Sequence, residues 1–249
     1  MKKFYEKHEL IFAILSIVAY VVLFSAADEI SALLGIEKVI TAVVGVAASV
    51  FWLWWLKKHA LHEKYGLCKG EFAPKTYLYF LPLALIVSVN LWGGVALHFS
   101  WFETVLYIVS MLCVGFLEEL IFRGFLFVSM RKDGLISAMI VSSLTFGIGH
   151  IINLLSGAEF IPTLLQICYA TAAGFLFTVI FHKSGNLLPC MIAHGALNAL
   201  SAFQAPASPV LQYVTAAVLT VVPVLYALWI LKNEKKPSVH EETDEKENA

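Results

Sequence analysis

Long apolar runs separated by short polar stretches fill most of this chain. A helix needs about 20 apolar residues to cross a bilayer, and such windows recur along the whole sequence. We therefore predict an all-α, polytopic membrane protein with about eight spanning helices. Their expected ranges are 9–27, 38–56, 76–98, 103–130, 135–153, 161–181, 186–203 and 209–231.

Two of these windows need a closer interpretation. Lys2 and Lys3 precede the first apolar run and small residues stand at 25–27, as in a signal peptide. The run is longer than the apolar core of such a peptide, about 7–15 residues, so we predict a retained helix. The fourth window is too long for a perpendicular span, and we expect it to tilt or to begin as an interfacial segment near Trp101.

Basic residues are distributed unequally between alternate loops. Lys and Arg are enriched in the cytoplasmic loops of membrane proteins. Almost all those outside the apolar windows lie at the N-terminus, in the second, fourth and sixth loops, or in the tail: Lys2, Lys3, Lys7, Lys57, Lys58, Lys64, Lys69, Lys75, Arg131, Lys132, Lys183, Lys232, Lys235, Lys236 and Lys246. The opposite loops carry Lys38 and five acids: Asp28, Glu29, Glu37, Glu103 and Glu159. We predict that both termini are cytoplasmic.

Composition agrees with a membrane protein. Hydrophobic residues make up 59% of the chain and charged residues 14%, whereas soluble domains carry about 25% charged residues. No basic stripe indicates nucleic-acid binding. We divide the chain into N-terminal helices (1–102), a helical core (103–203), a last helix (204–231) and a disordered polar tail (232–249).

Three charged residues interrupt the fourth apolar window, where each costs at least about 2.5–3.5 kcal/mol at the bilayer centre. Glu119 and Arg123 are four residues apart, acid before base, and can pair along one helix. Glu118 is rotated about 100° from Glu119 and has no such partner on its own helix. Since a cation partner makes a carboxylate a weaker base, we expect chemistry from Glu118 and support from Glu119 and Arg123.

Two further polar motifs lie in neighbouring windows. Phe146 and His150 end the fifth, and His194 and Asn198 lie in the seventh. The two residues of each motif are four apart and share a helix face. Counted from the turn between the fourth and fifth windows, Glu118 and His150 lie at similar depths, about 20 and 24 Å. We predict that these polar groups converge on one cavity.

Each group also has a structural interpretation. A single intramembrane His or Asn often forms an interhelical hydrogen bond worth about 0.6 kcal/mol, which applies to His150 or Asn198 alone. Taken alone, Glu119 and Arg123 can be interpreted as an ion pair that only stabilises the fold. Two glutamates, an arginine, two histidines and an asparagine in three neighbouring windows favour a joint functional site.

Taken together, the motifs resemble the CPBP family, which includes CAAX prenyl endopeptidases and bacteriocin-processing enzymes and is also called the Abi family. Its pattern E-E-x-x-x-R, F-x-x-x-H and H-x-x-x-N is matched by residues 118–123, 146–150 and 194–198, and the resemblance covers roughly 103–203. It implies an intramembrane endopeptidase with an all-helical fold. We expect a multi-pass protein of the cell membrane, of the bacterial inner-membrane type, acting on a peptide or membrane-protein substrate.

The resemblance also implies roles for the site residues. Glu118 is the general base that activates water, with His150 nearby. His194 and Asn198 polarise the scissile carbonyl and stabilise the oxyanion. The remaining motif residues support the site: Glu119, Arg123 and Phe146.

Two cofactor states stay open at this point. The family is often described as metalloproteases, and Glu118, His150 and His194 offer three zinc ligands, with water as the fourth. The chain has no H-E-x-x-H helix, the usual zinc-hydrolase signature. A metal-free site is chemically sufficient, because a carboxylate takes a proton from water while imidazole and amide donors stabilise the negative charge.

Two other functions fit part of the pattern. An ion-coupled transporter also places acids and histidines inside the membrane, but the inverted repeats of many transporters are not apparent. A non-catalytic bacteriocin-immunity or scaffold protein keeps its cellular role without Glu118, His150 and His194. The expected partners are the lipid bilayer and a polypeptide, with no nucleic acid.

Overall fold

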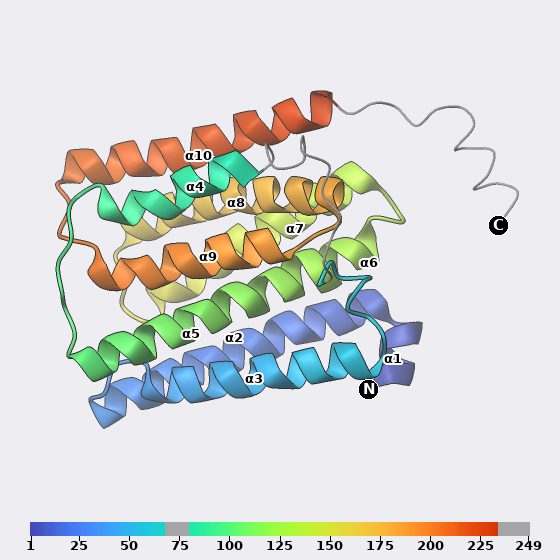
Figure 1. The fold of residues 1–249 in the computed structure, drawn as a ribbon, viewed down its shortest axis with the longest axis horizontal. Helices are drawn as coiled ribbons and strands as arrows, with labels where there is room; N and C mark the ends of the chain where they lie inside the picture. Colours follow the sequence, from blue (N-terminus) through green and yellow to red (C-terminus); the bar gives the residue numbers. More distant parts are fainter. Residues whose placement is uncertain (68–79, 234–249) are drawn as a thin grey trace, which may run out of the picture.

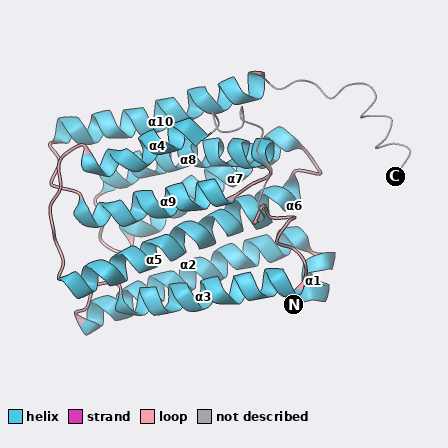
Figure 2. Ribbon diagram, viewed as in Figure 1, coloured by secondary structure: helices cyan, strands magenta, loops and turns pink. Residues whose placement is uncertain are grey.

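A computed structural model of the chain describes residues 1–67 and 80–233, which form a bundle of helices running back and forth along one axis (Figure 1). Within these residues the β pairing is a single bridge between Val95 and Gln204, and Figure 2 shows helices joined by loops. The predicted all-α class is therefore confirmed. Several predictions fall outside the described residues: the start of the window 76–98, the tail beyond 233, Lys69, Lys75, Lys235, Lys236 and Lys246.

Helices lie within each predicted window, although the described part of the window 76–98 is helical only over residues 81–91. The N-terminal part forms α1 (Lys2–Lys7), α2 (Glu9–Leu34), α3 (Val39–Lys58), α4 (Leu81–Ser88) and η2 (Val89–Leu91). The middle part forms α5 (Trp101–Glu119), η3 (Leu120–Phe127), α6 (Val128–Met130), α7 (Leu135–Gly149) and η4 (His150–Leu154). The last part forms α8 (Phe160–Ser184), α9 (Leu188–Leu200), η5 (Ser201–Phe203) and α10 (Pro209–Lys232).

The surface of the bundle is that of a membrane protein. Among residues 1–67 and 80–233, six helical runs are long and apolar enough to cross a bilayer, and Leu81–Leu91 and Leu188–Phe203 are shorter apolar helices. Large apolar side chains point outward, with Val22 and Val43 each 63% exposed, and a soluble monomer rarely exposes continuous apolar surface of this kind. The chain is thus a multi-pass membrane protein, while the count of eight spans stays a prediction.

The longest helical run begins with a capping box at Ser100. Ser100 Oγ accepts a hydrogen bond from Glu103 N at 3.3 Å, and the Glu103 carboxylate accepts one from Ser100 N at 3.2 Å. This reciprocal capping satisfies two backbone donors and starts the helix at Trp101, whose side chain is 83% exposed. The helix then continues without a break to Met130.

The wide turns of η3 interrupt the regular α-helical geometry of this run. Leu120–Phe127 is π-helical, a rare geometry that is often found at functional sites. It starts directly after Glu119 and contains Arg123, and all its residues are buried. The hydrophobic pattern predicts a helix here but does not predict this change in winding.

The packing order places α5 at the centre of the bundle. α5 packs against α3 and α9, and α8 packs against α7 and α10 (Figure 1). The end of α10 lies at the same end of the bundle as α1 (Figure 1). We call this the lysine-rich end; its described basic residues are Lys2, Lys3, Lys7, Lys57, Lys58, Lys64, Arg131, Lys132, Lys183 and Lys232. The opposite, acidic end has Asp28, Glu29, Glu37, Lys38, Glu103 and Glu159.

Candidate functional site

Two glycines bring the helices of the first and third motifs together. A Cβ atom added at Gly115 of α5 would overlap the backbone N and Cα of Gly195 in α9. Small residues of this kind let membrane helices approach closely. Because the backbones nearly touch here, Glu118 on α5 reaches His194 on α9.

A continuous chain of polar contacts crosses the bundle at this point. Arg123 Nη1 donates to Glu119 Oε1 at 3.0 Å, and both side chains are fully buried, so the pair expected from their spacing is present. His194 Nδ1 lies 2.9 Å from the same Glu119 oxygen, and His194 Nε2 lies 3.4 Å from Glu118 Oε2. Tyr20 on α2 donates its hydroxyl proton to Glu118 Oε1 at 2.9 Å. The two adjacent glutamates are therefore connected through one imidazole.

These contacts fix the orientation of His194. An ionised carboxylate only accepts hydrogen bonds, so Nδ1 donates its proton to Glu119. A histidine held in this way has a defined tautomer and presents its other nitrogen to the reactive group. Nε2 accordingly faces Glu118, and the ring is only 5% exposed.

Phe146 packs against the Arg123 guanidinium and against the rings of both histidines. The Arg123 guanidinium lies over its ring, with Cζ 4.1 Å from the ring centre. The rings of His150 and His194 pack edge-on against the same phenyl group, with centroid distances of 5.2 and 5.6 Å. The ring of Phe146 partly compensates the Arg123 atoms Nε and Nη2, which lack hydrogen-bond partners within the described part of the chain.

Gly174 on α8 leaves the space that the Arg123 side chain occupies. A Cβ added there would lie 2.5 Å from Arg123 Nη2 and 3.1 Å from Phe146 Cδ1. We expect Gly174→Ala to displace the guanidinium and to destabilise the protein by about 1–3 kcal/mol, the usual range for overpacking. Gly149→Ala is the matched control, because nothing lies within 4 Å of its added Cβ. Thermal unfolding in detergent micelles measures both, and equal midpoints would contradict this role for Gly174.

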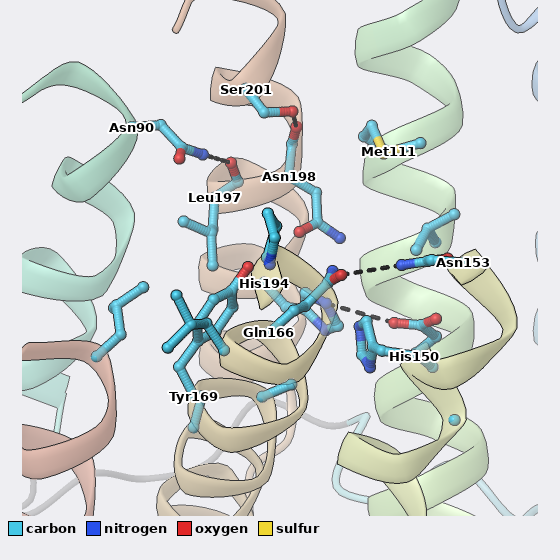
Figure 3. Close-up of a pocket in the computed structure, with 18 of the residues that line it drawn as sticks. Asn90, Met111, His150, Asn153, Gln166, Tyr169, His194, Leu197, Asn198 and Ser201 are labelled. Atoms are coloured by element: carbon cyan, nitrogen blue, oxygen red, sulfur yellow. Dashed lines mark hydrogen bonds and ion pairs between the residues drawn. The ribbon is translucent and has the colours of Figure 1, made fainter. Parts of the chain in front are cut away.

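His150 and Asn198 face the same cavity without touching Glu118. His150 Nδ1 donates to the backbone oxygen of Phe146 at 3.1 Å, which leaves Nε2 available. Asn198 lies one turn beyond His194 on α9, and Figure 3 shows His150, His194 and Asn198 around a common space. Among the described residues no hydrogen bond joins either side chain to Glu118. The structure thus brings Glu118 and His194 into direct contact and places His150 and Asn198 beside them.

The cavity has a volume of about 670 Å³, large enough for a stretch of peptide. Its wall includes polar side chains that the sequence motifs did not identify, among them Tyr20, Asn90, Asn153 and Gln166. Asn153 Nδ2 donates to Gln166 Oε1 at 2.9 Å, and Asn90 Nδ2 donates to the Leu197 carbonyl at 2.6 Å (Figure 3). A lone polar residue within an apolar window is the signal that would have found them.

The residues do not fit the zinc site considered from the sequence. No group of three or more His, Cys, Asp or Glu side chains in the described ranges is placed to hold a metal ion. The arrangement therefore gives no support to metal binding by Glu118, His150 and His194.

One comparison with known proteins bears on this geometry. A family profile described as type II CAAX prenyl endopeptidase Rce1-like matches residues 100–200, the range from α5 to the end of α9 that carries all three motifs. The family resemblance indicated by the motifs is confirmed over this range. Comparisons with curated proteins and with solved structures gave no match.

Proposed function

We propose that this membrane protein hydrolyses a peptide bond inside the bilayer, because residues 100–200 match the profile of the Rce1-like endopeptidase family. The observation that carries the proposal is the pair formed by Glu118 and His194 at the wall of a cavity of about 670 Å³. A carboxylate and an imidazole in contact, beside a space with amide groups, supply a base and hydrogen-bond donors for acyl transfer.

Glu118 is the general base in this proposal. It takes a proton from a water molecule while the water oxygen bonds to the scissile carbonyl carbon. The Tyr20 hydroxyl holds one oxygen of this carboxylate and His194 lies beside the other. Collapse of the tetrahedral intermediate breaks the C–N bond, and Glu118 returns the proton to the leaving amine. The products are a carboxylic acid and an amine.

The other motif residues stabilise charge and position the reactants. The Asn198 amide donates a hydrogen bond to the oxyanion. His194 already donates from Nδ1 to Glu119, so its Nε2 adds a second donor only in the doubly protonated imidazolium form. Glu119 and Arg123 hold the His194 ring from the opposite side, so they are positioning residues. His150, with Nδ1 engaged by a carbonyl, offers Nε2 as a second acceptor for the attacking water.

A peptide library tests the proposal. The purified full chain in detergent or liposomes is incubated with the library, with and without a chelator, and new termini are identified by mass spectrometry. We expect cleavage that survives chelation. Loss of cleavage with the chelator would overturn the metal-free site, and no cleavage of any peptide by folded protein would overturn the hydrolase.

Tyr20→Phe should lower the activity without unfolding the protein. The change removes one hydrogen bond to a charged group, worth about 1.5–3 kcal/mol, which corresponds to a loss of roughly tenfold or more in kcat. Tyr169→Phe is the matched control, since that hydroxyl also lines the cavity but has no hydrogen-bond partner among the described residues. Equal kcat values for the two variants would remove Tyr20 from the site.

A further inference from the structure

Among the described residues, those that line the cavity extend from the site toward one end of the bundle. Its wall includes loop residues at the acidic end, where chain segments connect α2 to α3, α7 to α8 and α9 to α10: Lys38, Ser156, Gln204 and Ala207. Along the helices, its lining residues nearest the lysine-rich end are at or close to the level of the site: Tyr20, Val89, Phe122, Phe146, Phe177, His194 and Leu219. No described residue in the loops at the lysine-rich end lines it.

Aromatic side chains pack together at the opposite end of the described bundle. We call Tyr5, Phe12, Trp55, Tyr65 and Phe125 the aromatic plug; each is at most 6% exposed. Their rings pack against one another, with Tyr65 and Phe125 at 5.1 Å and Phe12 and Phe125 at 5.4 Å between centroids. The plug packs α1, α2, α3 and η3 together at that end of the described bundle.

Lys64 fixes the loop that covers the plug. Its Nζ donates to the Tyr5 hydroxyl at 2.7 Å and to the Glu9 carboxylate, and the Tyr5 and Tyr65 hydroxyls are 2.6 Å apart. Burial acts to lower the pKa of Lys64, but the hydrogen bonds to Glu9 and Tyr5 outweigh it and raise this pKa. The ammonium group therefore stays charged at neutral pH. Its hydrogen bonds attach the loop that contains Lys64 to α1 and α2.

The charge distribution tells which side of the membrane each end faces. Basic residues mark cytoplasmic loops, so the lysine-rich end is predicted to be cytoplasmic. At the opposite, acidic end, the cavity is lined by the partly exposed ion pair of Asp28 and Lys38, whose charged atoms are 2.9 Å apart. We call this part of the cavity its mouth. From Trp101 at that end, about 26 Å of helix leads down to Glu118.

The wall between mouth and site carries amide groups. Asn90, Asn153, Gln166, Gln204 and Gln212 all line the cavity, and amides both donate and accept hydrogen bonds. An extended peptide presents one donor and one acceptor per residue, which such a wall can satisfy. A purely apolar chain would leave without partners those amide donors and acceptors that are not already bonded within the protein.

We infer that the site is entered from the non-cytoplasmic side, through the acidic end, and that its substrate is an extended polypeptide segment exposed on that side. The choice of substrate rests on the proposed hydrolase function, whereas the route of entry does not. The lysine-rich end stays closed by the aromatic plug.

Sided cysteine labelling tests the route. Met111, which lines the cavity on α5 (Figure 3), is changed to cysteine in a full chain whose four native cysteines are replaced by alanine. Asp133→Cys and Ala158→Cys, both at exposed positions, report the lysine-rich and acidic ends respectively. Right-side-out and inverted membrane vesicles are treated with a membrane-impermeant maleimide, and denatured samples give the total reactive thiol.

We expect Met111→Cys to react in the same vesicles as Ala158→Cys, namely right-side-out ones, and Asp133→Cys in the inverted ones. Reaction of Met111→Cys from the Asp133 side, from both sides or from neither would overturn the route, as would reversed labelling of the two end reporters. Gln212→Cys, a second cavity position on α10, repeats the measurement if Met111→Cys does not insert.

The labelling result is independent of catalysis. If labelling is as expected but no peptide is cleaved, the route stands and the hydrolase proposal fails. A peptide library is also added to the outer solution of intact inverted vesicles and of intact right-side-out vesicles. If it is cleaved by the inverted vesicles but not by the right-side-out ones, the hydrolase stands and the proposed entry fails.

Discussion

Replacing Glu118 with glutamine should reduce peptide cleavage by about 10²–10⁴-fold, the usual contribution of a general base. Glutamine keeps the size of the side chain and still accepts the hydrogen bond from Tyr20, so the fold should survive. It cannot take a proton from water. The measurement is the cleavage rate of a peptide found in the library screen, with thermal unfolding of the same sample to show that the variant is folded.

Glu159→Gln is the control for this prediction. Glu159 lies at the start of α8, is exposed at the acidic end and has the same chemistry outside the site. Its substitution should leave the cleavage rate unchanged. Wild-type cleavage by Glu118→Gln would remove Glu118 as the base, and an equal loss in both variants would point to a general effect of charge removal.

The second large effect should come from Arg123→Met, which we expect to destabilise the protein by about 3–5 kcal/mol. Breaking a buried ion pair from one side leaves an uncompensated charge, here the fully buried Glu119 carboxylate. The guanidinium contact with Phe146 is lost as well. Replacing both partners, as Glu119→Gln with Arg123→Met, removes the orphan charge and should recover part of this loss.

Thermal unfolding midpoints in detergent micelles check this prediction. Lys2→Met is the matched control, because Lys2 and Glu6 form a pair of the same i, i+4 spacing that is about half exposed. Surface pairs are worth about 0–1 kcal/mol, so this variant should unfold close to the wild type. If Arg123→Met unfolds at the same temperature as Lys2→Met, the buried pair does not stabilise the fold.

Much of the fold follows from the hydrophobic pattern. Apolar windows locate the helices because only helices satisfy their backbone groups inside lipid, and the capping pair of Ser100 and Glu103 sets the start of α5. The π-helical winding of η3 does not follow, since it depends on tertiary packing of residues that are all buried. The short described length of Leu81–Leu91 likewise differs from the long window predicted there.

The site was partly predictable for a related reason. Charges in apolar windows are expensive, so Glu118, Glu119 and Arg123 are visible in the sequence, and helix phase alone predicts which glutamate pairs with the arginine. Tyr20 was missed because it comes from α2, and spacing carries no information about contacts between distant helices. Gly174 was missed because the space it leaves for Arg123 exists only after α8 has packed.

Cleavage in oxygen-18 water is the most direct test of the central claim, that Glu118 activates water for peptide hydrolysis inside the bundle. Wild-type protein and Glu118→Gln are incubated side by side with the same peptide. Mass spectrometry then measures the mass of the product that carries the new carboxyl terminus. We predict one heavy oxygen in the wild-type product and essentially no product from the variant. Labelled product formed equally fast by both proteins, or no labelled product from folded wild-type protein, would contradict the account.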